Sequence, residues 1–220
     1  MSVWAILAAA GSGERLGGDR PKAFARLGDL PLLGESLRRL DACDRIDAIV
    51  VAVPSGWEEP AILLAEELGA GKVSASISGG ASRTETVRKA LAEVPTDAAV
   101  ILVHDAARPV LPADVVERVL TSLSEGWDGA VPALPVPDTV KRVLGDQVIE
   151  TLDRTELVAV QTPQAFVASV LREAMAGPGD ASDCASLVEA RGGRVRIVPG
   201  DRRLLKVTTS DDLALVSAWL

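Results

Sequence analysis

The fold is decided by the apolar stretch VWAILAAA at residues 3–10, which runs straight into the glycine loop Gly11-Ser12-Gly13. The stretch lacks the alternation of a half-exposed strand, and continuous runs of this kind are typical of strands buried on both faces of a sheet. Residues 48–53 and 98–103 form two more such runs. We therefore predict a sheet of buried, mostly parallel strands.

Helical patterns lie between these runs. Residues 83–94 place apolar side chains at helical spacing, and Ser82 with Glu85 has the sequence of a capping box at the start. A second helix is predicted to begin at Pro112, because apolar residues follow it at helical spacing. Alternating strands and helices indicate an α/β fold, with helices on both faces of a mostly parallel sheet.

An extended hairpin interrupts this alternation after Ala133. Residues 140–144 and 148–152 are predicted strands, joined by a Gly145-Asp146 turn. We expect a single domain over residues 1–220, with an inserted β-hairpin arm at about residues 135–152. The α/β body is then predicted to resume with a strand at 158–161, helices at 167–175 and after Asp180, short strands at 195–198 and 204–207, and a last helix that Ser210 caps and that extends to Leu220.

Charge and cysteine content exclude several classes of protein. A net charge of −8 argues against nucleic acid as a partner, because binding to a phosphate backbone depends on surplus lysine and arginine. Cys43 and Cys184 lie far apart and the chain has one histidine, so no zinc site is predicted. No apolar run is long enough to span a bilayer, and the N-terminus lacks the basic region of a signal peptide. We expect a cytoplasmic protein without a membrane partner.

The glycine loop is the first candidate site. Small residues allow a ligand to approach the backbone closely, and successive N–H groups can bind an anion. Gly11 and Gly13 alone would favour a plain strand–turn–helix junction, but Arg15 and Lys22 add the positive charge that a triphosphate requires. A dinucleotide-binding loop would need glycine in place of Leu16, and the P-loop sequence Gly-Lys-Ser/Thr is absent.

The second candidate site is the segment HDAARP at residues 104–109, directly after a predicted strand. Ligands of open α/β sheets bind outside the carboxyl ends of the strands, so Asp105 is well placed to hold Mg²⁺. His104, the only histidine, is expected to be a structural hydrogen-bonding residue. Arg108 is either a phosphate ligand or a partner for Asp105, and the sequence leaves both roles open.

A third group, GGASRTET at residues 79–86, combines two glycines with a helix start. The glycines would let backbone groups contact the edge of a base, although a loop followed by a helix cap would explain the same residues.

Taken in order and spacing, these motifs resemble the 2-C-methyl-D-erythritol 4-phosphate cytidylyltransferases of isoprenoid biosynthesis. The resemblance rests on AAAGSGERLGGDRPKAF, the glycine pair, HDAARP, PDTVKR, TLDRTELVAVQTPQAF and LLKVTTSDDL, and it covers nearly the whole chain. The first motif is shared by many nucleotidyltransferases, whereas HDAARP together with Asp-Arg and Gln-Thr-Pro-Gln is more specific. The resemblance implies a Rossmann-like nucleotidyltransferase sheet.

The resemblance also implies a role for each matching residue. Thr86 stands where relatives usually carry serine, which keeps the hydroxyl but adds a methyl group to the base pocket. The arm would reach across a homodimer, so that Thr139 serves the partner's site. The implied roles are catalysis for Arg15, Lys22, Arg154 and Lys206, nucleotide binding for Ala9, Ala10, Gly11, Gly80, Thr86 and Ala106, substrate binding for Asp105, Arg108, Thr139 and Thr162, and Mg²⁺ binding for Asp105.

The implied reaction transfers CMP from CTP to 2-C-methyl-D-erythritol 4-phosphate, a step of non-mevalonate isoprenoid precursor biosynthesis. No general base is needed, because a phosphate monoester with a second pKa of about 6 is mostly dianionic near neutral pH. Catalysis then consists of positioning and charge stabilisation. Three alternatives stay open: a cytidylyltransferase for another polyol phosphate such as ribitol 5-phosphate, a sugar-1-phosphate or molybdopterin nucleotidyltransferase, and an inactive nucleotide-binding regulatory homologue.

Overall fold

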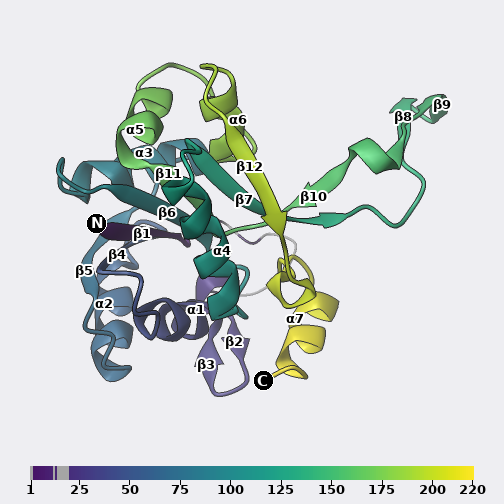
Figure 1. The fold of residues 1–220 in the computed structure, drawn as a ribbon. Coiled ribbons are helices and arrows are strands. Elements are labelled where there is room, and N and C mark those ends of the chain that lie inside the picture. The colour runs from purple at the N-terminus through teal and green to yellow at the C-terminus, as the bar shows by residue number, and fades with distance from the viewer. Residues whose placement is uncertain (1, 12, 14–19) are drawn as a thin grey trace.

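The central sheet of the computed structural model, which describes residues 2–11, 13 and 20–220, is built from the apolar runs (Figure 1). Its strands lie in the order β10-β7-β11-β6-β1-β4-β5, and β12 pairs with β7. The pairs β1–β4, β1–β6, β4–β5 and β7–β12 are parallel, whereas β11 and β10 run antiparallel to their neighbours. The strands are β1 (Val3–Ala8), β4 (Ala48–Val53), β5 (Val73–Ser78), β6 (Val100–Asp105), β7 (Gly129–Pro135), β10 (Val158–Val160), β11 (Gln164–Val167) and β12 (Val195–Pro199).

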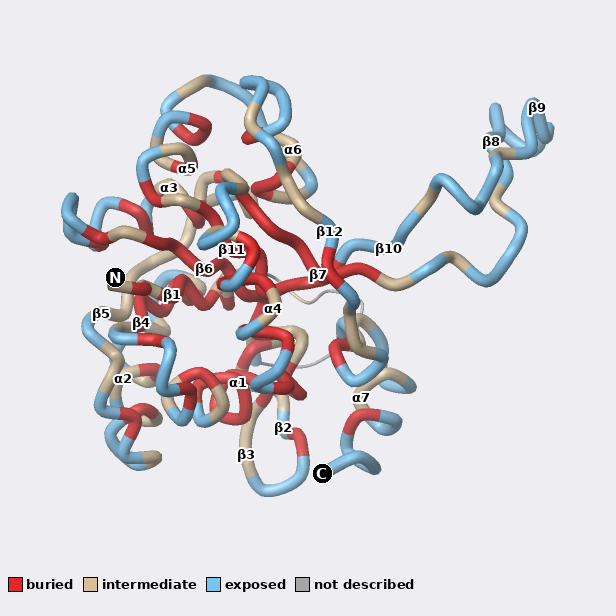
Figure 2. The backbone as a smooth tube through the Cα atoms, in the orientation of Figure 1, coloured by how far each residue is buried: buried red, intermediate tan, exposed pale blue. Residues whose placement is uncertain are grey.

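Helices cover both faces of this sheet, as predicted. In β1, Ala5 and Leu7 pack on one face, whereas Ile6 packs on the other, because successive strand residues point to opposite sides. The first face packs against α1 (Leu32–Asp41), α2 (Glu58–Glu67) and α4 (Ala113–Ser124), and the second against α3 (Arg83–Glu93), α5 (Ala168–Met175) and α6 (Cys184–Glu189). Figure 2 shows the buried strands in the middle of the body.

A smaller third cluster joins the end of the chain to the body. Val207 and Val216 pack against Leu27, Leu32 and Val110. This cluster holds α7 (Ser210–Ser217) beside the short hairpin of β2 (Arg26–Leu27) and β3 (Leu30–Pro31). Along the ranges that the structure describes, no helix has the length and apolar character needed to cross a membrane.

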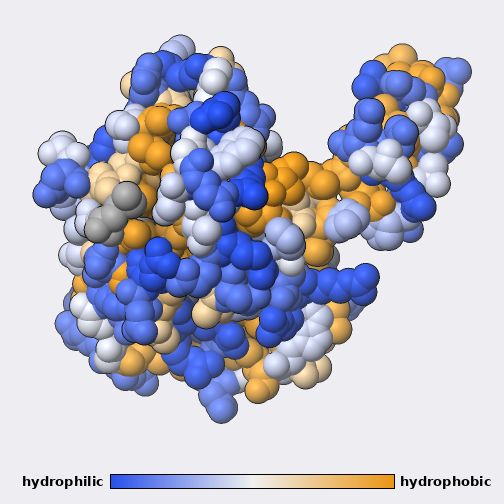
Figure 3. All heavy atoms as spheres, viewed as in Figure 1, coloured by the Kyte–Doolittle hydropathy of each residue, from blue (hydrophilic) through white to orange (hydrophobic). Residues whose placement is uncertain are grey.

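The predicted arm is present and extends away from the body (Figure 1). It carries β8 (Lys141–Leu144) and β9 (Gln147–Thr151), which pair antiparallel to each other. Its large apolar side chains are more than half exposed, with values of 55% for Val143, 72% for Leu144 and 53% for Ile149. Figure 3 shows hydrophobic residues along the arm and where it leaves the body. Exposed apolar surfaces of this kind commonly mark interaction sites.

Three predictions about element ends were wrong. Residues 204–207 are not a strand: η4 (Arg202–Leu204) is a short 3₁₀ helix, and extended backbone follows it. Thr209, not Ser210, caps α7, because its side chain accepts from Asp212 N while the Asp212 carboxylate accepts from Thr209 N. This capping box makes Ser210 the first helical residue, and the helix ends at Ser217 rather than at Leu220.

The capping box predicted at α3 is half formed. The Ser82 side chain accepts a hydrogen bond from Glu85 N at 3.1 Å, as expected. The Glu85 carboxylate, however, accepts from Ala81 N at 2.8 Å instead of from the cap residue. The carboxylate thereby fixes the loop one residue before the cap.

Candidate active site

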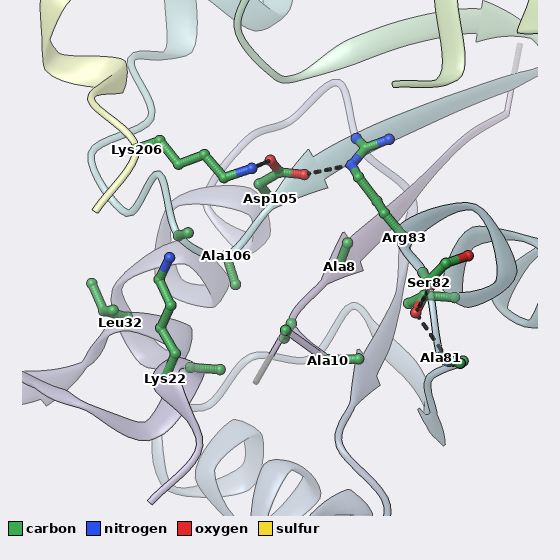
Figure 4. Close-up of a pocket in the computed structure, with 16 residues that line it drawn as sticks. Ala8, Ala10, Lys22, Leu32, Ala81, Ser82, Arg83, Asp105, Ala106 and Lys206 are labelled. Carbon is green, nitrogen blue, oxygen red and sulfur yellow. Dashed lines mark hydrogen bonds and ion pairs between the residues drawn. The ribbon is translucent and has the colours of Figure 1, made fainter. Parts of the chain in front are cut away.

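A cleft of about 390 Å³ opens at the carboxyl ends of β1 and β6, where the topology of an α/β sheet places ligands. It brings together residues from the glycine loop, the start of α3, the end of β6 and the segment before α7, as Figure 4 shows. The residues that line it are Ala8, Ala9, Ala10, Gly11, Lys22, Ala23, Leu32, Gly80, Ala81, Ser82, Arg83, Thr86, Asp105, Ala106, Ala107 and Lys206.

One end of the cleft is formed by backbone and small side chains. Ala106 N donates to Ala8 O at 3.0 Å, which ties the loop after β6 to the end of β1. Gly79 lies so close to this strand end that a Cβ there would come within 2.2 Å of the Ala10 side chain. A Cβ on Gly80 would meet the Glu85 side chain at 2.4 Å. Glycine at position 79 therefore lets the loop lie against Ala10, and glycine at position 80 lets it lie against Glu85.

Thr86 shapes the same end of the cleft. Its hydroxyl donates to Ser82 O at 2.8 Å and accepts from Gly80 N at 3.0 Å. The side chain is buried, and its Oγ1 and Cγ2 lie next to the open side of Gly79. The Thr86 hydroxyl thus sets the orientation of the loop that contains Gly79 and Gly80, in addition to lining the cleft.

Asp105 is the buried carboxylate at the centre of the cleft, and two cations approach it from opposite sides (Figure 4). Its Oδ1 accepts from Arg83 Nε at 3.1 Å, and its Oδ2 accepts from Lys206 Nζ at 2.8 Å. Burial opposes ionisation, but the charges of Arg83 and Lys206 outweigh it and hold the pKa of Asp105 well below its usual range. Asp105 is therefore ionised at neutral pH.

His104 is linked to the backbone of Asp105 through Thr162. The Thr162 hydroxyl accepts from Asp105 N and lies 3.1 Å from His104 Nδ1, while His104 Nε2 lies 3.0 Å from Arg108 O. Because a carbonyl only accepts, Nε2 carries the proton and the threonine donates to Nδ1. Burial lowers the pKa of His104 to about 4, so the ring is neutral. The prediction of a structural hydrogen-bonding histidine is confirmed.

Arg108 holds the segment that carries Lys206. Its Nη1 donates to Leu204 O at 2.6 Å, and Val207 N donates to Ala107 O at 2.8 Å, so hydrogen bonds fix the chain on both sides of Lys206. Burial lowers the pKa of Arg108, whose Nε is buried without a hydrogen-bond partner among the described residues. Neither Arg108 nor Thr162 lines the cleft surface, and both act here on the residues that do.

Lys22 lies at the start of η2 (Lys22–Phe24), and its side chain rises into the cleft beside Leu32 and Ala106 (Figure 4). Gly13 packs against it: with φ at +71°, a Cβ on Gly13 would lie 2.4 Å from the Lys22 Cβ. The glycine loop and the lysine are therefore adjacent in space, as the sequence predicted. Arg15 lies outside the described residues.

Two predicted site residues do not reach this cleft: Thr139, on the arm, and Arg154, just after the predicted end of the arm. Thr139 and Arg154 are exposed, and neither is among the described residues that line the cleft. Arg154 begins η3 (Arg154–Glu156), and its guanidinium donates to the Pro137 carbonyl within the arm. Within one chain, the site therefore lacks these two side chains.

Sequence reasoning missed Arg83. Its guanidinium contacts Asp105, donates to Cys184 Sγ at 3.3 Å and lines the cleft. A signal was present, since a basic residue stood first in a helix that follows a glycine pair, but only the fold shows that it faces the end of β6. The cations Lys22, Arg83 and Lys206 give the cleft the charge expected of a site for phosphates.

The sequence matches the family model described as 2-C-methyl-D-erythritol 4-phosphate cytidylyltransferase over residues 3–220. A relative of that name from Saccharopolyspora erythraea is 47% identical and is covered in full, as is this chain. A second, from Nocardia farcinica, is 44% identical over 100% of this chain and 94% of its own length. The crystal structure of the protein of that name from Thermus thermophilus superposes with a TM-score of 0.80 at 34% identity, covering 97% of this chain and 96% of its own. The cleft and these similarities agree: the chain belongs to the 2-C-methyl-D-erythritol 4-phosphate cytidylyltransferase family of nucleotidyltransferases.

Proposed function

We propose that the chain transfers CMP from CTP to 2-C-methyl-D-erythritol 4-phosphate, giving CDP-methylerythritol and pyrophosphate. The observation that carries this proposal is the convergence of Lys22, Asp105 and Lys206 on one cleft at the carboxyl ends of β1 and β6. An oxygen of the acceptor phosphate attacks the α-phosphorus of CTP. The bond from that phosphorus to the bridging oxygen breaks, and the electron pair leaves with pyrophosphate.

The nucleotide is assigned to the end of the cleft that is formed by backbone and small side chains. Ala9, Ala10 and Gly11 follow β1, while Gly80, Thr86 and Ala106 face them. The exposed N–H and C=O groups of such a surface can read the polar edge of cytosine. Lys22 and Arg15 are assigned to the phosphates, where positive charge stabilises the transition state more than the ground state.

The acceptor phosphate is assigned to Lys206 in the cleft and to Arg154 and Thr139 of a partner's arm. Lys206 is half exposed and lies 2.8 Å from Asp105, so it faces the open side of the cleft. Arg108 and Thr162 would assist through the hydrogen bonds that hold Lys206 and Asp105 in place. Cations that are fixed in place would hold the acceptor phosphate in line with the α-phosphorus, and this positioning lowers the barrier to attack.

The residues fit a Mg²⁺ ion that is bound mainly through the nucleotide. Asp105 is the carboxylate among the described lining residues, and Mg²⁺ commonly takes one or two carboxylates together with substrate phosphates and water. In the described part of the chain, no group of three or more histidine, cysteine or acidic residues forms a metal cage. The ion would supply positive charge to the phosphates, while Asp105 would orient it from the end of β6.

A homodimer would complete the site. The arm exposes Val143, Leu144, Val148 and Ile149, and a second copy is the partner that would both cover them and receive Arg154. Sedimentation at working concentration should give the mass of two chains, and a fully active monomer would refute this assembly. We also take residues 1–220 as one nucleotidyltransferase domain and place the enzyme in the cytoplasm.

The transfer itself is tested by coupled detection of pyrophosphate with a panel of nucleotides and polyol phosphates. We expect release with CTP, Mg²⁺ and methylerythritol phosphate. Faster turnover of ribitol 5-phosphate would change the acceptor while leaving the reaction class intact. The absence of pyrophosphate with every pair would instead indicate an inactive nucleotide-binding homologue.

A further inference from the structure

Arg83 is the first residue of α3 and is fixed at two points. Its Nε donates to Asp105 Oδ1 at 3.1 Å, and its Nη1 donates to the Cys184 thiol at 3.3 Å, at the start of α6. Its Nη2 is buried without a hydrogen-bond partner in the part of the chain that the structure describes. The guanidinium is thus held by two helices and a strand, which leaves it little freedom to turn.

The two cations that flank Asp105 are not equivalent. Lys206 takes the other carboxylate oxygen, but its side chain is 43% exposed, against 21% for Arg83 and 9% for Asp105. Lys206 also ends in a flexible ammonium, which forms point contacts rather than the fixed fork of a guanidinium. Of the two partners of Asp105, Lys206 is therefore the one that can exchange its contact.

Charge balance links these two contacts. A buried carboxylate that loses its only cation is strongly disfavoured, so a single partner would be held in place. With Arg83 as a second, permanent partner, Asp105 stays compensated when Lys206 turns to another anion. We propose that Arg83 is a positioning residue, the standing counter-ion of Asp105 that frees Lys206 to bind the acceptor phosphate; the inference rests on the proposed role of Lys206.

The proposal predicts an effect on one substrate. Without Arg83, Lys206 becomes the only cation, among the described residues, that is hydrogen-bonded to the Asp105 carboxylate, and it is retained there, which weakens binding of the acceptor. The nucleotide end of the cleft, formed by residues 8–11 and by the Thr86 network, keeps its own hydrogen bonds. Acceptor binding should suffer and nucleotide binding should not.

The test replaces Arg83 by methionine, which preserves most of the side-chain volume. We expect Arg83→Met to lower kcat/KM for methylerythritol phosphate roughly 10- to 100-fold, the usual effect of removing a group that orients a site residue, mainly through KM. Calorimetric titration should give a CTP affinity within about twofold of wild type. Arg83→Lys, which keeps the charge, should recover part of the loss. An equal fall in CTP affinity, or an unchanged acceptor KM, would overturn the proposal.

Arg88, five residues further along α3, is the matched control. It is also tied to the neighbouring segment, donating to the carbonyls of Met175, Gly177 and Gly179, but it lies away from the cleft. Arg88→Met should lower the melting temperature while leaving both KM values near wild type. If Arg83→Met behaved in the same way, Arg83 would be a structural residue only.

A double substitution tests whether Arg83 acts through Lys206. In an Asp105→Asn background, which removes the charge that Arg83 compensates, Arg83→Met should change the acceptor KM by about twofold or less, since no carboxylate is left to retain Lys206. Full additivity of the two effects would contradict the mechanism. Wild-type release of pyrophosphate from CTP and methylerythritol phosphate tests the proposed function separately, so failure of the Arg83 proposal leaves that result standing.

Discussion

The buried part of the cleft around Asp105, called its floor below, and the arm hold their charged side chains in opposite ways. At the floor, Asp105 is buried, paired with two cations and supported through Thr162 and His104. On the arm, Arg154 is exposed and bonded only to its own arm among the described contacts. The floor is complete within one chain, whereas the arm carries apolar and basic side chains outward, away from the body.

The difference shows which parts of the site one chain can preorganise. A sheet edge fixes residues far apart in sequence, and their orientation is set before any ligand arrives. An arm fixes nothing on its own body and becomes part of a site when it meets a second surface. Nucleotide binding should therefore depend on the cleft, and acceptor binding on the cleft and the arm together.

The largest expected effects distinguish the role of Lys22 in the cleft from the role of Arg154. Lys22→Ala should reduce kcat about 10²- to 10³-fold with either substrate varied, because removing one donor that stabilises transition-state charge has an effect of this size. Arg154→Ala should weaken methylerythritol phosphate binding and slow the reaction, yet leave CTP affinity in calorimetry nearly unchanged. If Arg154→Ala lost as much CTP affinity as Lys22→Ala, the assignment of the arm to the acceptor would be wrong.

Mixing these two impaired variants tests the exchange of arms. In a mixed dimer, one site would receive both substitutions and the other neither, provided that each arm serves the opposite chain. After equilibration of equal amounts, roughly a quarter of all sites should be intact, because half of the dimers are mixed and each carries one intact site. Pyrophosphate release should recover accordingly. Mixtures as inactive as the separate proteins would place Arg154 in its own chain's site or exclude the dimer.

His104 should make the floor sensitive to mild acid. Its folded-state pKa is lowered to about 4 by burial, whereas the unfolded chain takes up a proton near pH 6.5. The stability that it contributes is present above pH 6.5 and is lost as the pH falls toward 4. Between pH 7 and pH 5, the free energy of unfolding should decrease by about 2 kcal/mol.

Urea titrations at several pH values measure this slope. Because the chain has a single histidine, His104→Gln should remove most of the slope in this window while keeping a donor at the end of the side chain. The arm, without a histidine, should not contribute to it. A slope that persists in the variant would show that another group titrates there.

The smallest expected effect concerns the rim of the cleft. Thr86→Val removes the acceptor of Gly80 N and should raise the KM for CTP about five- to tenfold, since a partly buried donor that loses its partner costs on the order of 1 kcal/mol. Thr86→Ser keeps the hydroxyl and should stay within about twofold. Neither substitution should alter the KM for methylerythritol phosphate. A raised KM for CTP in Thr86→Ser with none in Thr86→Val would mean that the methyl group, not the hydroxyl, matters at this position.

Sequence patterns predicted several of the buried strands of the body, but not all of its secondary-structure elements. The buried runs predicted β1, β4 and β6, because continuous apolar residues leave few alternatives. The strand β7 was not predicted, since Pro132 and Pro135 interrupt its pattern and prolines usually mark the edge or end of a strand. Likewise, the three apolar residues Leu204, Leu205 and Val207 suggested a strand where the structure has a 3₁₀ helix and a backbone hydrogen bond to Ala107.

The candidate site shows the same limit. Lys22, Asp105 and Lys206 stood in recognisable motifs, and the cleft brings them together. Arg83 and the buried network beneath Asp105 could not be predicted, because their contacts depend on which strand ends lie side by side. Thr162 reaches Asp105 across 57 residues, through a neighbourhood that β11 and β6 create.

The position of Lys206 late in the chain has a consequence for synthesis on the ribosome. The glycine loop and Asp105 are translated first, and domains begin to fold from the N-terminus as the chain emerges. Lys206 joins them only when two hydrogen bonds fix its segment. Arg108 Nη1 donates to Leu204 O, and Val207 N donates to Ala107 O. A nascent or prematurely terminated chain could thus form the nucleotide end of the cleft but would lack the acceptor end. Nearly the whole polypeptide must therefore be synthesised before the reaction can occur, and incomplete chains would not consume CTP.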